Sequence, residues 1–150
     1  MEVNGVAHTF ITASDFEASV TFYRRLLPFL GMQIVADSLD TFYGVGGRTG
    51  FGIRRPTAEF AGAKYEQYRI GLHHHCWRAR ERGDVDALHD FLVSIGAKIV
   101  HGPQEDQYAP GYYSVLFEDP DGIRLEVNHV PGRGLFDTKT QRVGASLDDR

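Results

Sequence analysis

Two stretches of the chain repeat one pattern of apolar and polar positions. Residues 27–35, LPFLGMQIV, and residues 92–100, LVSIGAKIV, both read L-x-x-[LI]-G-x-x-I-V. In each copy the first two apolar positions end a stripe with helical spacing, the glycine suits a left-handed helix C-cap, and the final pair begins a strand. The pattern therefore predicts a helix followed by a strand, twice in one chain.

Further strand-like segments flank each predicted helix. Residues 6–11 and 70–77 precede the two helices as short strands, and the runs after the helices are bounded by Gly, Pro and Asp turns. Those later strands are predicted over residues 40–46, 49–55, 111–118 and 122–130. The chain is thus expected to have an α+β fold, with two βαβββ modules forming a curved mixed sheet around a central cavity.

Local signals also place the helix starts and one turn. Ser14 with Glu17 three residues later matches a capping box, and Asp84 is positioned to cap a helix that begins at Val85. The glycine-rich run GVGGRTG, residues 44–50, precedes a predicted strand and matches no nucleotide-binding loop. It is therefore predicted to be a hairpin.

Length limits the number of domains. The 150 residues suit one domain, predicted over residues 1–131. Its modules are expected at about residues 5–55 and 70–130, with a linker over residues 56–69. Residues 132–150 are polar and without periodicity, so they are predicted to be a C-terminal tail.

Charge and cysteine content narrow the class of protein. The net charge is −4 with both signs interspersed, which argues against a nucleic-acid footprint or a polybasic membrane patch. The single cysteine excludes an intrachain disulfide framework and a Cys-based zinc site. No leader or membrane-spanning stretch is found, so we expect a cytoplasmic protein whose partner is a small molecule.

The last predicted strand has one polar face. The residues at positions 123, 125 and 127 are apolar and should pack against the helices, whereas Arg124, Glu126 and Asn128 share the opposite face. A solvated, salt-bridged face is the more frequent outcome for a glutamate of this kind. A site on this face is the other interpretation, and the remaining strands must decide between them.

The run LHHHCWRAR, residues 72–80, contains three consecutive histidines. If the run is a strand, His73 and His75 point to one side and His74 to the other. The spacing after His8, an apolar residue at plus three and alanine at plus five, recurs after His74 and fits His73 less well. Counting back without gaps from the two repeat glycines instead pairs His8 with His73. We choose His74 as the equivalent of His8, with His73 as the fallback.

With these features the chain resembles the vicinal oxygen chelate superfamily, which includes glyoxalase I, extradiol dioxygenases and bleomycin-binding resistance proteins. The resemblance is carried by DFEASVTFY at residues 15–23, HHCW at residues 74–77 and FEDPDGIRLEV at residues 117–127. It covers roughly residues 5–130. The last of these motifs is fairly specific for the superfamily and poorly specific within it.

The resemblance implies a metal centre. Carried over by position, the ligands of the superfamily fall on His8, His74 and Glu126, and a fourth ligand position of glyoxalase I falls on Gly52, which cannot coordinate. Two imidazoles and one carboxylate with open positions suit Fe(II) or Mn(II), with Zn(II) or Ni(II) as further candidates. Without the metal, the same fold would serve a binding protein.

Such a metal can chelate two neighbouring substrate oxygens and act as a Lewis acid. The resemblance thus implies a metal-dependent enzyme acting on a small molecule with vicinal oxygens. Open positions for a chelated catechol and O2 give a slight preference for a dioxygenase. A glyoxalase-type lyase, isomerase or epimerase is the alternative within the enzymes, and a metal-free drug-binding resistance protein is the alternative of another class.

Other residues are candidates because of their positions around the implied metal. The candidate catalytic residues are Tyr112, Tyr113 and Glu126, and the candidate substrate-binding residues are Arg54, Tyr108 and Arg124. For each tyrosine an ordinary place in a strand is at least as frequent. Because modules of the superfamily pair within a chain or between chains, a homodimer is also expected.

Overall fold

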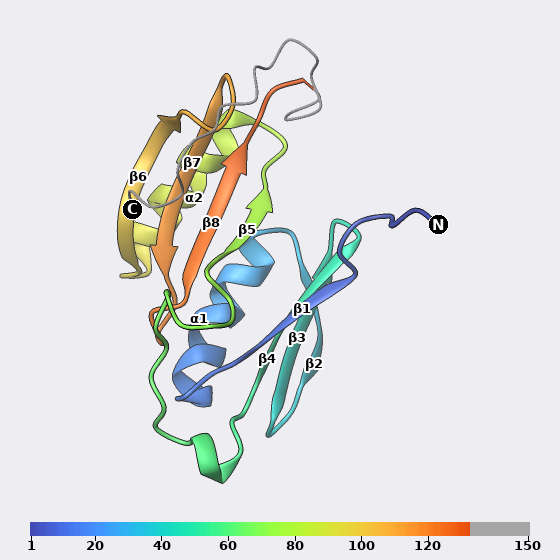
Figure 1. Ribbon diagram of the computed structural model, residues 1–150, viewed down its shortest axis with the longest axis vertical. Helices are drawn as coiled ribbons and strands as arrows, with labels where there is room; N and C mark the ends of the chain where they lie inside the picture. Colours follow the sequence, from blue (N-terminus) through green and yellow to red (C-terminus); the bar gives the residue numbers. More distant parts are fainter. Residues whose placement is uncertain (133–150) are drawn as a thin grey trace. The chain divides into compact units, whose positions relative to one another are not determined.

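The computed structural model of the protein describes residues 1–132. The described chain divides into two compact units, the first comprising residues 1–66 and 120–122 and the second comprising residues 67–119 and 123–132. In the described residues each unit contains a four-stranded mixed sheet and an α-helix, as Figure 1 shows. The predicted α+β fold of two βαβββ modules is therefore confirmed.

The first unit is built in the predicted order of one strand, one helix and three strands. Its elements are β1 (His8–Thr12), α1 (Phe16–Phe29), β2 (Gln33–Asp37), β3 (Thr41–Gly46) and β4 (Thr49–Arg54). The sheet order is β1-β4-β3-β2, with β1 parallel to β4 and the other pairs antiparallel. A short 3-10 helix, η1 (Ala58–Phe60), lies in the predicted linker.

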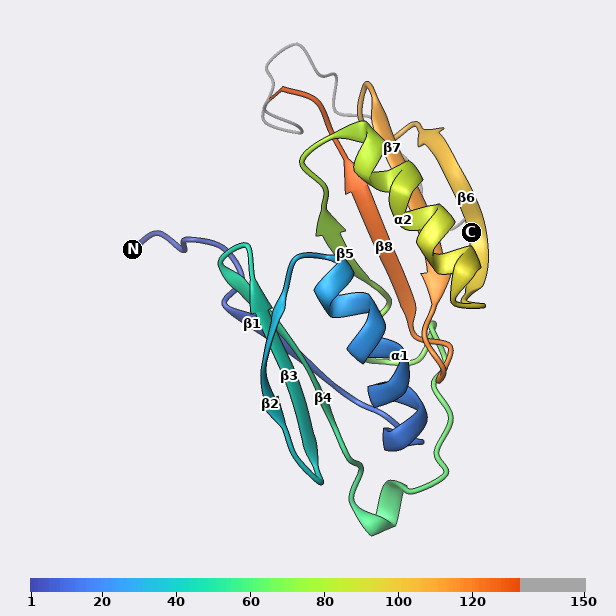
Figure 2. The ribbon, with the colours of Figure 1, turned by 180° about the vertical axis from the view of Figure 1, so that it is seen from behind.

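The second unit repeats this order. Its elements are β5 (His75–Arg78), α2 (Arg82–Ser94), β6 (Lys98–Asp106), β7 (Tyr112–Glu118) and β8 (Arg124–His129). The sheet order β5-β8-β7-β6 matches that of the first unit strand for strand, again with one parallel pair. Figure 2 shows α2 lying along one face of this sheet.

The two sheets match residue by residue at their parallel strand pairs. In the first unit Phe10 on β1 pairs with Gly52 on β4, and in the second unit Cys76 on β5 pairs with Glu126 on β8. One further backbone hydrogen bond closes each pair at its end, from the Ala13 N–H in the first unit at 3.0 Å and from the Ala79 N–H in the second at 2.7 Å. The strands β1 and β5 therefore share one register.

This shared register decides which histidine corresponds to His8. His8 stands two residues before Phe10, and His74 stands two residues before Cys76, so the backbone makes His8 and His74 equivalent. Counting back from the repeat glycines misses this because α1 has 14 residues and α2 has 13. The one-residue gap lies in the helix, and it leaves the strands unaffected.

The repeated L-x-x-[LI]-G motif ends each helix in the same way. Gly31 and Gly96 have φ angles of 76° and 73°, the left-handed region that glycine enters at little cost. The Met32 N–H donates to the Leu27 carbonyl and the Ala97 N–H to the Leu92 carbonyl, both at 2.9 Å. The predicted glycine C-caps are thus present in both units.

The core of each unit lies between its helix and one face of its sheet. Its largest side chains are less than 2% exposed and follow the helical and alternating periods read from the sequence. In the first unit they are Tyr23, Leu26, Leu27, Phe42, Phe51 and Ile53, and in the second they are Val85, Leu88, Leu92, Val115, Phe117 and Leu125. This burial is the main source of stability in a domain of this size.

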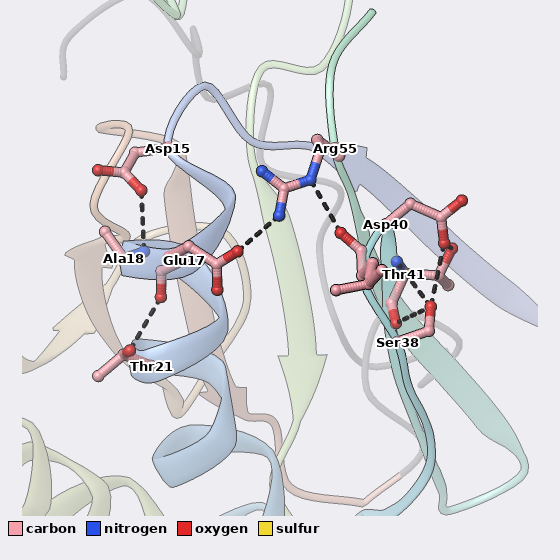
Figure 3. A network of polar contacts seen from close by, with 9 residues as sticks. Asp15, Glu17, Ala18, Thr21, Ser38, Asp40, Thr41 and Arg55 are labelled. Atoms are coloured by element: carbon pink, nitrogen blue, oxygen red, sulfur yellow. Dashed lines mark hydrogen bonds and ion pairs between the residues drawn. The ribbon is translucent and has the colours of Figure 1, made fainter.

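Both helices begin differently from the predicted starts. Asp15, rather than Ser14, is the N-cap of α1, and its carboxylate accepts the Ala18 N–H at 3.0 Å (Figure 3). The Ser14 backbone N–H instead donates to the carboxylate of Asp121 at 2.9 Å. The Glu17 carboxylate instead accepts a hydrogen bond from Arg55. The Ser14 capping box was therefore wrong, because a contact distant in sequence replaced the local one.

The start of α2 is also earlier than predicted. The helix begins at Arg82, and Asp84 lies inside its first turn instead of capping a helix that begins at Val85. The Asp84 carboxylate accepts the N–H of Glu81, the N-cap residue, at 2.9 Å. An acidic residue suits both positions, because the first turn carries unpaired N–H groups and the positive end of the helix dipole.

Arg55 ties the start of α1 to the turn between β2 and β3 (Figure 3). Its Nη2 donates to the Glu17 carboxylate at 2.5 Å, and its Nε donates to the Leu39 carbonyl at 2.8 Å. The guanidinium also lies 4.6 Å from the ring centroid of Phe16. Arg55 therefore has a structural role within the first unit.

The predicted hairpin over residues 44–50 is confirmed as the connection between β3 and β4. Gly47 and Arg48 both have positive φ angles, 58° and 66°, as a two-residue type I′ turn requires. In the part of the chain that the structure describes, none of the helices combines the length and apolarity needed to cross a bilayer. The predicted tail, apart from its first residue, lies outside the described residues.

Candidate functional site

The three consecutive histidines do not form one strand. Strand β5 begins at His75, so His73 and His74 precede it, and Gly71 with a φ angle of 145° interrupts the extended chain. The expected strand over residues 70–77 was therefore too long at its start. The alternation of faces holds from His75 onward, and the side chains of His73 and His74 have to be placed by their contacts.

His75 lies on the face of its sheet that α2 covers. It pairs in register with the buried Leu125, and its ring packs edge-on against Trp77 at 4.4 Å between centroids. Burial, with a smaller contribution from the neighbouring His74, lowers the pKa of His75 from 6.5 to about 4. His75 is therefore a neutral packing residue at neutral pH.

In each sheet one face packs against the helix of its unit, and we call the other the helix-free face. In the second unit Tyr113 points to the covered face, since its hydroxyl donates to Asp86 on α2 at 2.6 Å. The Arg82 guanidinium, also on α2, lies 3.6 Å from the same ring. Tyr113 is thus on the wrong face to act with Glu126, and its predicted catalytic role is not supported.

Glu126 occupies the middle of the helix-free face of the second unit. The strand register aligns it with Cys76 on one side and with Leu116 and His101 on the other. The residue is only 3% exposed. The solvated, salt-bridged interpretation of this strand face was therefore wrong at Glu126, whose carboxylate is removed from water.

Two side chains approach the Glu126 carboxylate. The Tyr112 hydroxyl donates to Oε1 at 2.6 Å, and the Nε2 atom of His74 lies 3.6 Å from Oε2. Burial and the bond to Glu126 raise the pKa of Tyr112, so the hydroxyl keeps its proton. One carboxylate oxygen is thus fixed by a neutral donor, and the other faces an imidazole nitrogen.

Cys76 borders this group without being activated by it. Burial, followed by the charge of Glu126, raises the pKa of its thiol. The thiolate is the nucleophilic and metal-binding form of cysteine. Cys76 therefore stays a thiol, although the residue is exposed at the surface.

The donors of His74 and Glu126 suit a divalent ion. Two ligand atoms each about 2.1 Å from one ion lie about 3.0–3.5 Å apart, close to the 3.6 Å between Nε2 and Oε2. A cation would also compensate the charge of a carboxylate that is otherwise costly to bury. Within residues 1–132 no group of three or more His, Cys, Asp or Glu side chains is assembled for a metal. Two of the three predicted ligands are thus together.

The third predicted ligand, His8, belongs to the first unit. It is exposed at the start of β1 on the helix-free face, and its ring meets the edge of Phe10 at 5.6 Å between centroids. Its equivalence to His74 follows from the register of the two sheets. Its role as a ligand remains a prediction.

His73 supports His74. Its Nδ1 atom lies 2.8 Å from Nδ1 of His74, and its Nε2 atom lies 2.9 Å from the side-chain amide of Gln67. Both ring nitrogens of His73 are thus within hydrogen-bonding distance of other side chains. This arrangement makes His73 a weaker ligand candidate than His74.

Two of the three predicted substrate-binding residues lie in the second unit. Arg124 is on the helix-free face, but its Nε donates to Glu118 at 3.0 Å, and Glu118 also pairs with Lys98 at 2.7 Å. The ring of Tyr108 packs edge-on against Tyr112 at 5.2 Å between centroids. Tyr108 therefore lies next to the Glu126 group, whereas Arg124 is held in a network of ion pairs.

The third predicted substrate-binding residue, Arg54, ends β4 in the first unit. Its guanidinium lies 5.6 Å from the centroid of Phe10, also on the helix-free face. In the described residues no carboxylate or carbonyl accepts a hydrogen bond from the Arg54 side chain, in contrast to Arg55. Of the two arginines predicted for substrate binding, Arg54 is therefore the one whose guanidinium can still donate hydrogen bonds to a ligand.

Sequence reasoning missed one residue of the helix-free face, His101. It lies on β6 in the same row as Glu126, with its Nδ1 atom 2.9 Å from the Gly102 carbonyl. Register shifts on either side of His101 break the alternation that would have shown that the strand continues past Val100. The residues Gly102 and Pro103, which are typical of turns, also argue against a strand at this point of the sequence.

Comparisons with known proteins agree with this architecture. The model of the Glyoxalase/Bleomycin resistance protein/Dioxygenase superfamily matches residues 5–127. The uncharacterized protein YqjT of Bacillus subtilis strain 168 is 27% identical over 128 residues, which cover 80% of this chain and 94% of YqjT. The metallothiol transferase FosB of Shouchella clausii is 25% identical over 126 residues, which cover 84% of this chain and 80% of FosB.

A solved structure also shares the fold. The glyoxylase/bleomycin resistance protein/dioxygenase domain from Frankia sp. EAN1pec superposes with a TM-score of 0.68 at 22% identity, covering 85% of this chain and 98% of that domain. The chain therefore belongs to the Glyoxalase/Bleomycin resistance protein/Dioxygenase superfamily. The predicted resemblance to the vicinal oxygen chelate superfamily is confirmed.

Proposed function

We propose that the protein is a metal-dependent enzyme that acts on a small molecule with vicinal oxygen atoms. The observation that carries the proposal is the pair of His74 Nε2 and Glu126 Oε2, 3.6 Å apart around a buried carboxylate. A binding protein without a metal has no need for this costly burial of charge. Similarity to a protein named a metallothiol transferase supports a metal in this family member.

His8 is the proposed third ligand, from the first unit of the same chain or of a second copy. The second case would make the site shared between subunits, and we propose a homodimer for this reason. Two imidazoles and one carboxylate leave open positions that suit Fe(II) or Mn(II). When bound, such an ion would chelate neighbouring substrate oxygens and stabilise negative charge on them.

His73 and Gln67 would orient His74. Coordination through Nε2 requires the ring hydrogen of His74 on Nδ1, which donates it to Nδ1 of His73 at 2.8 Å. His73 then carries its own hydrogen on Nε2 and donates it to the amide of Gln67 at 2.9 Å. The amide presents its oxygen there in one of its two orientations of equal shape. His73 is thus a positioning residue.

Tyr112 would hold the Glu126 carboxylate in place and keep a proton beside the substrate. Because its pKa is raised, the hydroxyl is a donor throughout the physiological pH range. With Fe(II) and O2 this arrangement suits ring cleavage of a catechol, which remains our slight preference. The same hydroxyl, whose oxygen lies 2.6 Å from Oε1 of Glu126, favours proton transfer on carbon as the second candidate, a lyase or isomerase reaction.

The metal is tested on protein purified without chelator and then titrated after metal removal. We expect about one Fe or Mn per chain by elemental analysis, and Glu126→Gln should weaken the affinity by more than about 100-fold. His89→Gln, a histidine on α2 away from the helix-free face, is the matched control and should bind as the wild type does. Equal affinity of the two variants would refute the site.

The reaction class is then decided by oxygen uptake with a panel of catechols. A dioxygenase consumes O2 in proportion to ring-cleaved product, whereas a lyase, isomerase or epimerase consumes none. Tyr112→Phe separates the two further, since it removes the proton beside Glu126 and should lower kcat more in the proton-transfer reaction. Tight binding of an apolar drug by metal-free protein, with no metal uptake, would instead favour sequestration.

A further inference from the structure

The helix-free face of the first unit carries an aromatic pair. Phe10 on β1 and Tyr43 on β3 stand on either side of β4, and their rings stack with centroids 5.1 Å apart and planes 17° from parallel. Phe10 keeps 41% of its surface exposed. A single exposed aromatic side chain is common on a domain surface. In this pair, however, both rings are held in place by the strand beneath them.

That support is the glycine pattern of β4. A Cβ atom at Gly52 would lie 2.2 Å from Cε1 of Phe10, and one at Gly50 would lie 2.0 Å from the hydroxyl oxygen of Tyr43. Both distances are far below contact, so the two rings occupy the space of the missing side chains. The rings therefore lean across β4 only because residues 50 and 52 are glycines, and the fourth ligand position is closed by Phe10.

Polar groups surround the pair. The Arg54 guanidinium lies 5.6 Å from the Phe10 centroid and donates a hydrogen bond to no carboxylate in the described residues. The nearby Asp40 has a lowered pKa chiefly because Ser38 and Thr41 donate hydrogen bonds to it, with Arg54 a lesser cause. Its carboxylate therefore already has partners. The positive charge at Arg54 thus lies over an exposed ring.

We propose that this face binds an aromatic acid, whose ring extends the Phe10 and Tyr43 stack and whose carboxylate pairs with Arg54. Offset stacking is the preferred geometry between aromatic rings, and a guanidinium pairs with a carboxylate through two parallel hydrogen bonds. The site lies within one unit and needs no metal. If the protein is the enzyme proposed above, aromatic acids are its substrate class. The inference about catalysis therefore rests on the proposed function.

The test uses three probes on the full-length protein after metal removal. They are 2-naphthoate, its neutral amide 2-naphthamide and the saturated acid decahydro-2-naphthoate. Binding is measured by calorimetry and by chemical-shift changes of the Phe10 and Arg54 signals. We expect 2-naphthoate to bind about tenfold more tightly than either the amide or the saturated acid, because each lacks one of the two interactions.

Variants locate the binding site. Arg54→Gln and Phe10→Leu should each weaken 2-naphthoate binding by about tenfold, and Arg54→Gln should abolish the preference over the amide. Arg25→Gln, an exposed arginine on α1, is the matched control and should change nothing. Gly52→Ala should also weaken binding, because its Cβ would displace the Phe10 ring.

The proposal is overturned if 2-naphthoate does not bind, if all three probes bind alike, or if Arg54→Gln binds as tightly as Arg25→Gln. It is also overturned if Phe10→Leu or Arg54→Gln converts a dimer to a monomer in sedimentation, since a second copy then covers the face. Metal titrations on the same samples keep the two proposals separate. Naphthoate binding without metal binding refutes only the metal centre, and the reverse refutes only the aromatic site.

Discussion

The helix-free faces of the two units have the same backbone and opposite chemistry. In the first unit the middle row across three strands reads Tyr43, Gly52 and Phe10. The equivalent row in the second unit reads Leu116, Glu126 and Cys76. One row places two large rings around an empty centre, and the other places a carboxylate at the centre between smaller neighbours.

This difference shows which part of a duplicated module can change. The helices that cover the other faces end in the same motif, because each must bury a continuous core against its sheet. The helix-free face is not needed for that core, so it can exchange a glycine for a glutamate at one register position. In the first unit the change provides an aromatic surface, and in the second it provides a buried ligand.

The largest expected effect is on the free energy of unfolding, and it tests whether the helix-covered faces of the two units contribute equally to stability. Leu27 and Leu92 are equivalent repeat residues, and both are fully buried. Leu27→Ala and Leu92→Ala should each lower the free energy of unfolding by about 2–5 kcal/mol, since each opens a cavity in a core. Urea denaturation measures both values.

Val93→Ala, next to Leu92 but 57% exposed, is the control and should change the free energy of unfolding by less than about 0.5 kcal/mol. If one leucine variant costs less than about 1 kcal/mol while the other costs several, the two covered faces are not equivalent. The helix-free faces could then not be compared as two variants of one equivalent module.

The next effect concerns the metal-binding side of the comparison. His74→Ala removes a proposed ligand and should weaken metal affinity by more than about 100-fold, whereas His73→Ala removes only a supporting hydrogen bond and should cost about tenfold. Titration of metal-free protein with Fe(II) or Mn(II) gives both affinities. His73→Asn, which can still accept a hydrogen bond, should recover part of the loss. The reverse order of the two alanine variants would make His73 the ligand.

Much of the fold was predictable because each element has a strong local signal. The repeated motif around Gly31 and Gly96 gave both helix ends, and the apolar alternation at positions 123, 125 and 127 gave the covered face of β8. Glu126 could be placed on the opposite face by the same alternation. Predictions of this kind succeed where one period dominates a segment.

The remaining features depend on contacts that are distant in sequence. The cap of α1 differs from the prediction because Ser14 binds Asp121, and the continuation of β6 beyond its first residues was missed because bulges break its period near His101. Tyr112 and Tyr113 are equally good strand residues, and only their partners show that Tyr112 faces Glu126. The stacking of Phe10 and Tyr43 likewise has no local signal beyond two glycines on another strand.

The burial of His75 should make the stability of the protein depend on pH. The unfolded chain takes up a proton on His75 near pH 6.5, but the folded protein does so only near pH 4. Between these values the unfolded state binds more protons, so stability falls as the pH is lowered from about 6.5 towards 4. With allowance for its partial exposure, His75 should account for about 1–2 kcal/mol of this loss.

His75→Gln removes the titrating group, so the drop in the free energy of unfolding between pH 7 and pH 4 should shrink by that amount. Urea denaturation of metal-free protein at several pH values measures it. Val93→Ala, an exposed change on α2 that removes no titrating group, is the control and should keep the wild-type pH profile. An unchanged profile for His75→Gln would mean that the ring takes up its proton in the folded state as easily as in the unfolded one.

The smallest expected effect separates two neighbouring arginines in the first unit. Arg55 donates to Glu17 and to the Leu39 carbonyl and lies over Phe16, so Arg55→Gln should lower the free energy of unfolding by about 1 kcal/mol. Arg54 has no such partners in the described residues, and Arg54→Gln should change it by less than about 0.5 kcal/mol.

The two variants should reverse their order when ligand binding is measured. Arg54→Gln is expected to weaken binding of the aromatic acid and Arg55→Gln to leave it unchanged, because of the two only the Arg54 guanidinium lies over the Phe10 ring. Thermal unfolding and calorimetry on the same samples give both rankings. A loss of stability in Arg54→Gln as large as that in Arg55→Gln would show that Arg54 also supports the fold, and the face would then have no available cation for an acid.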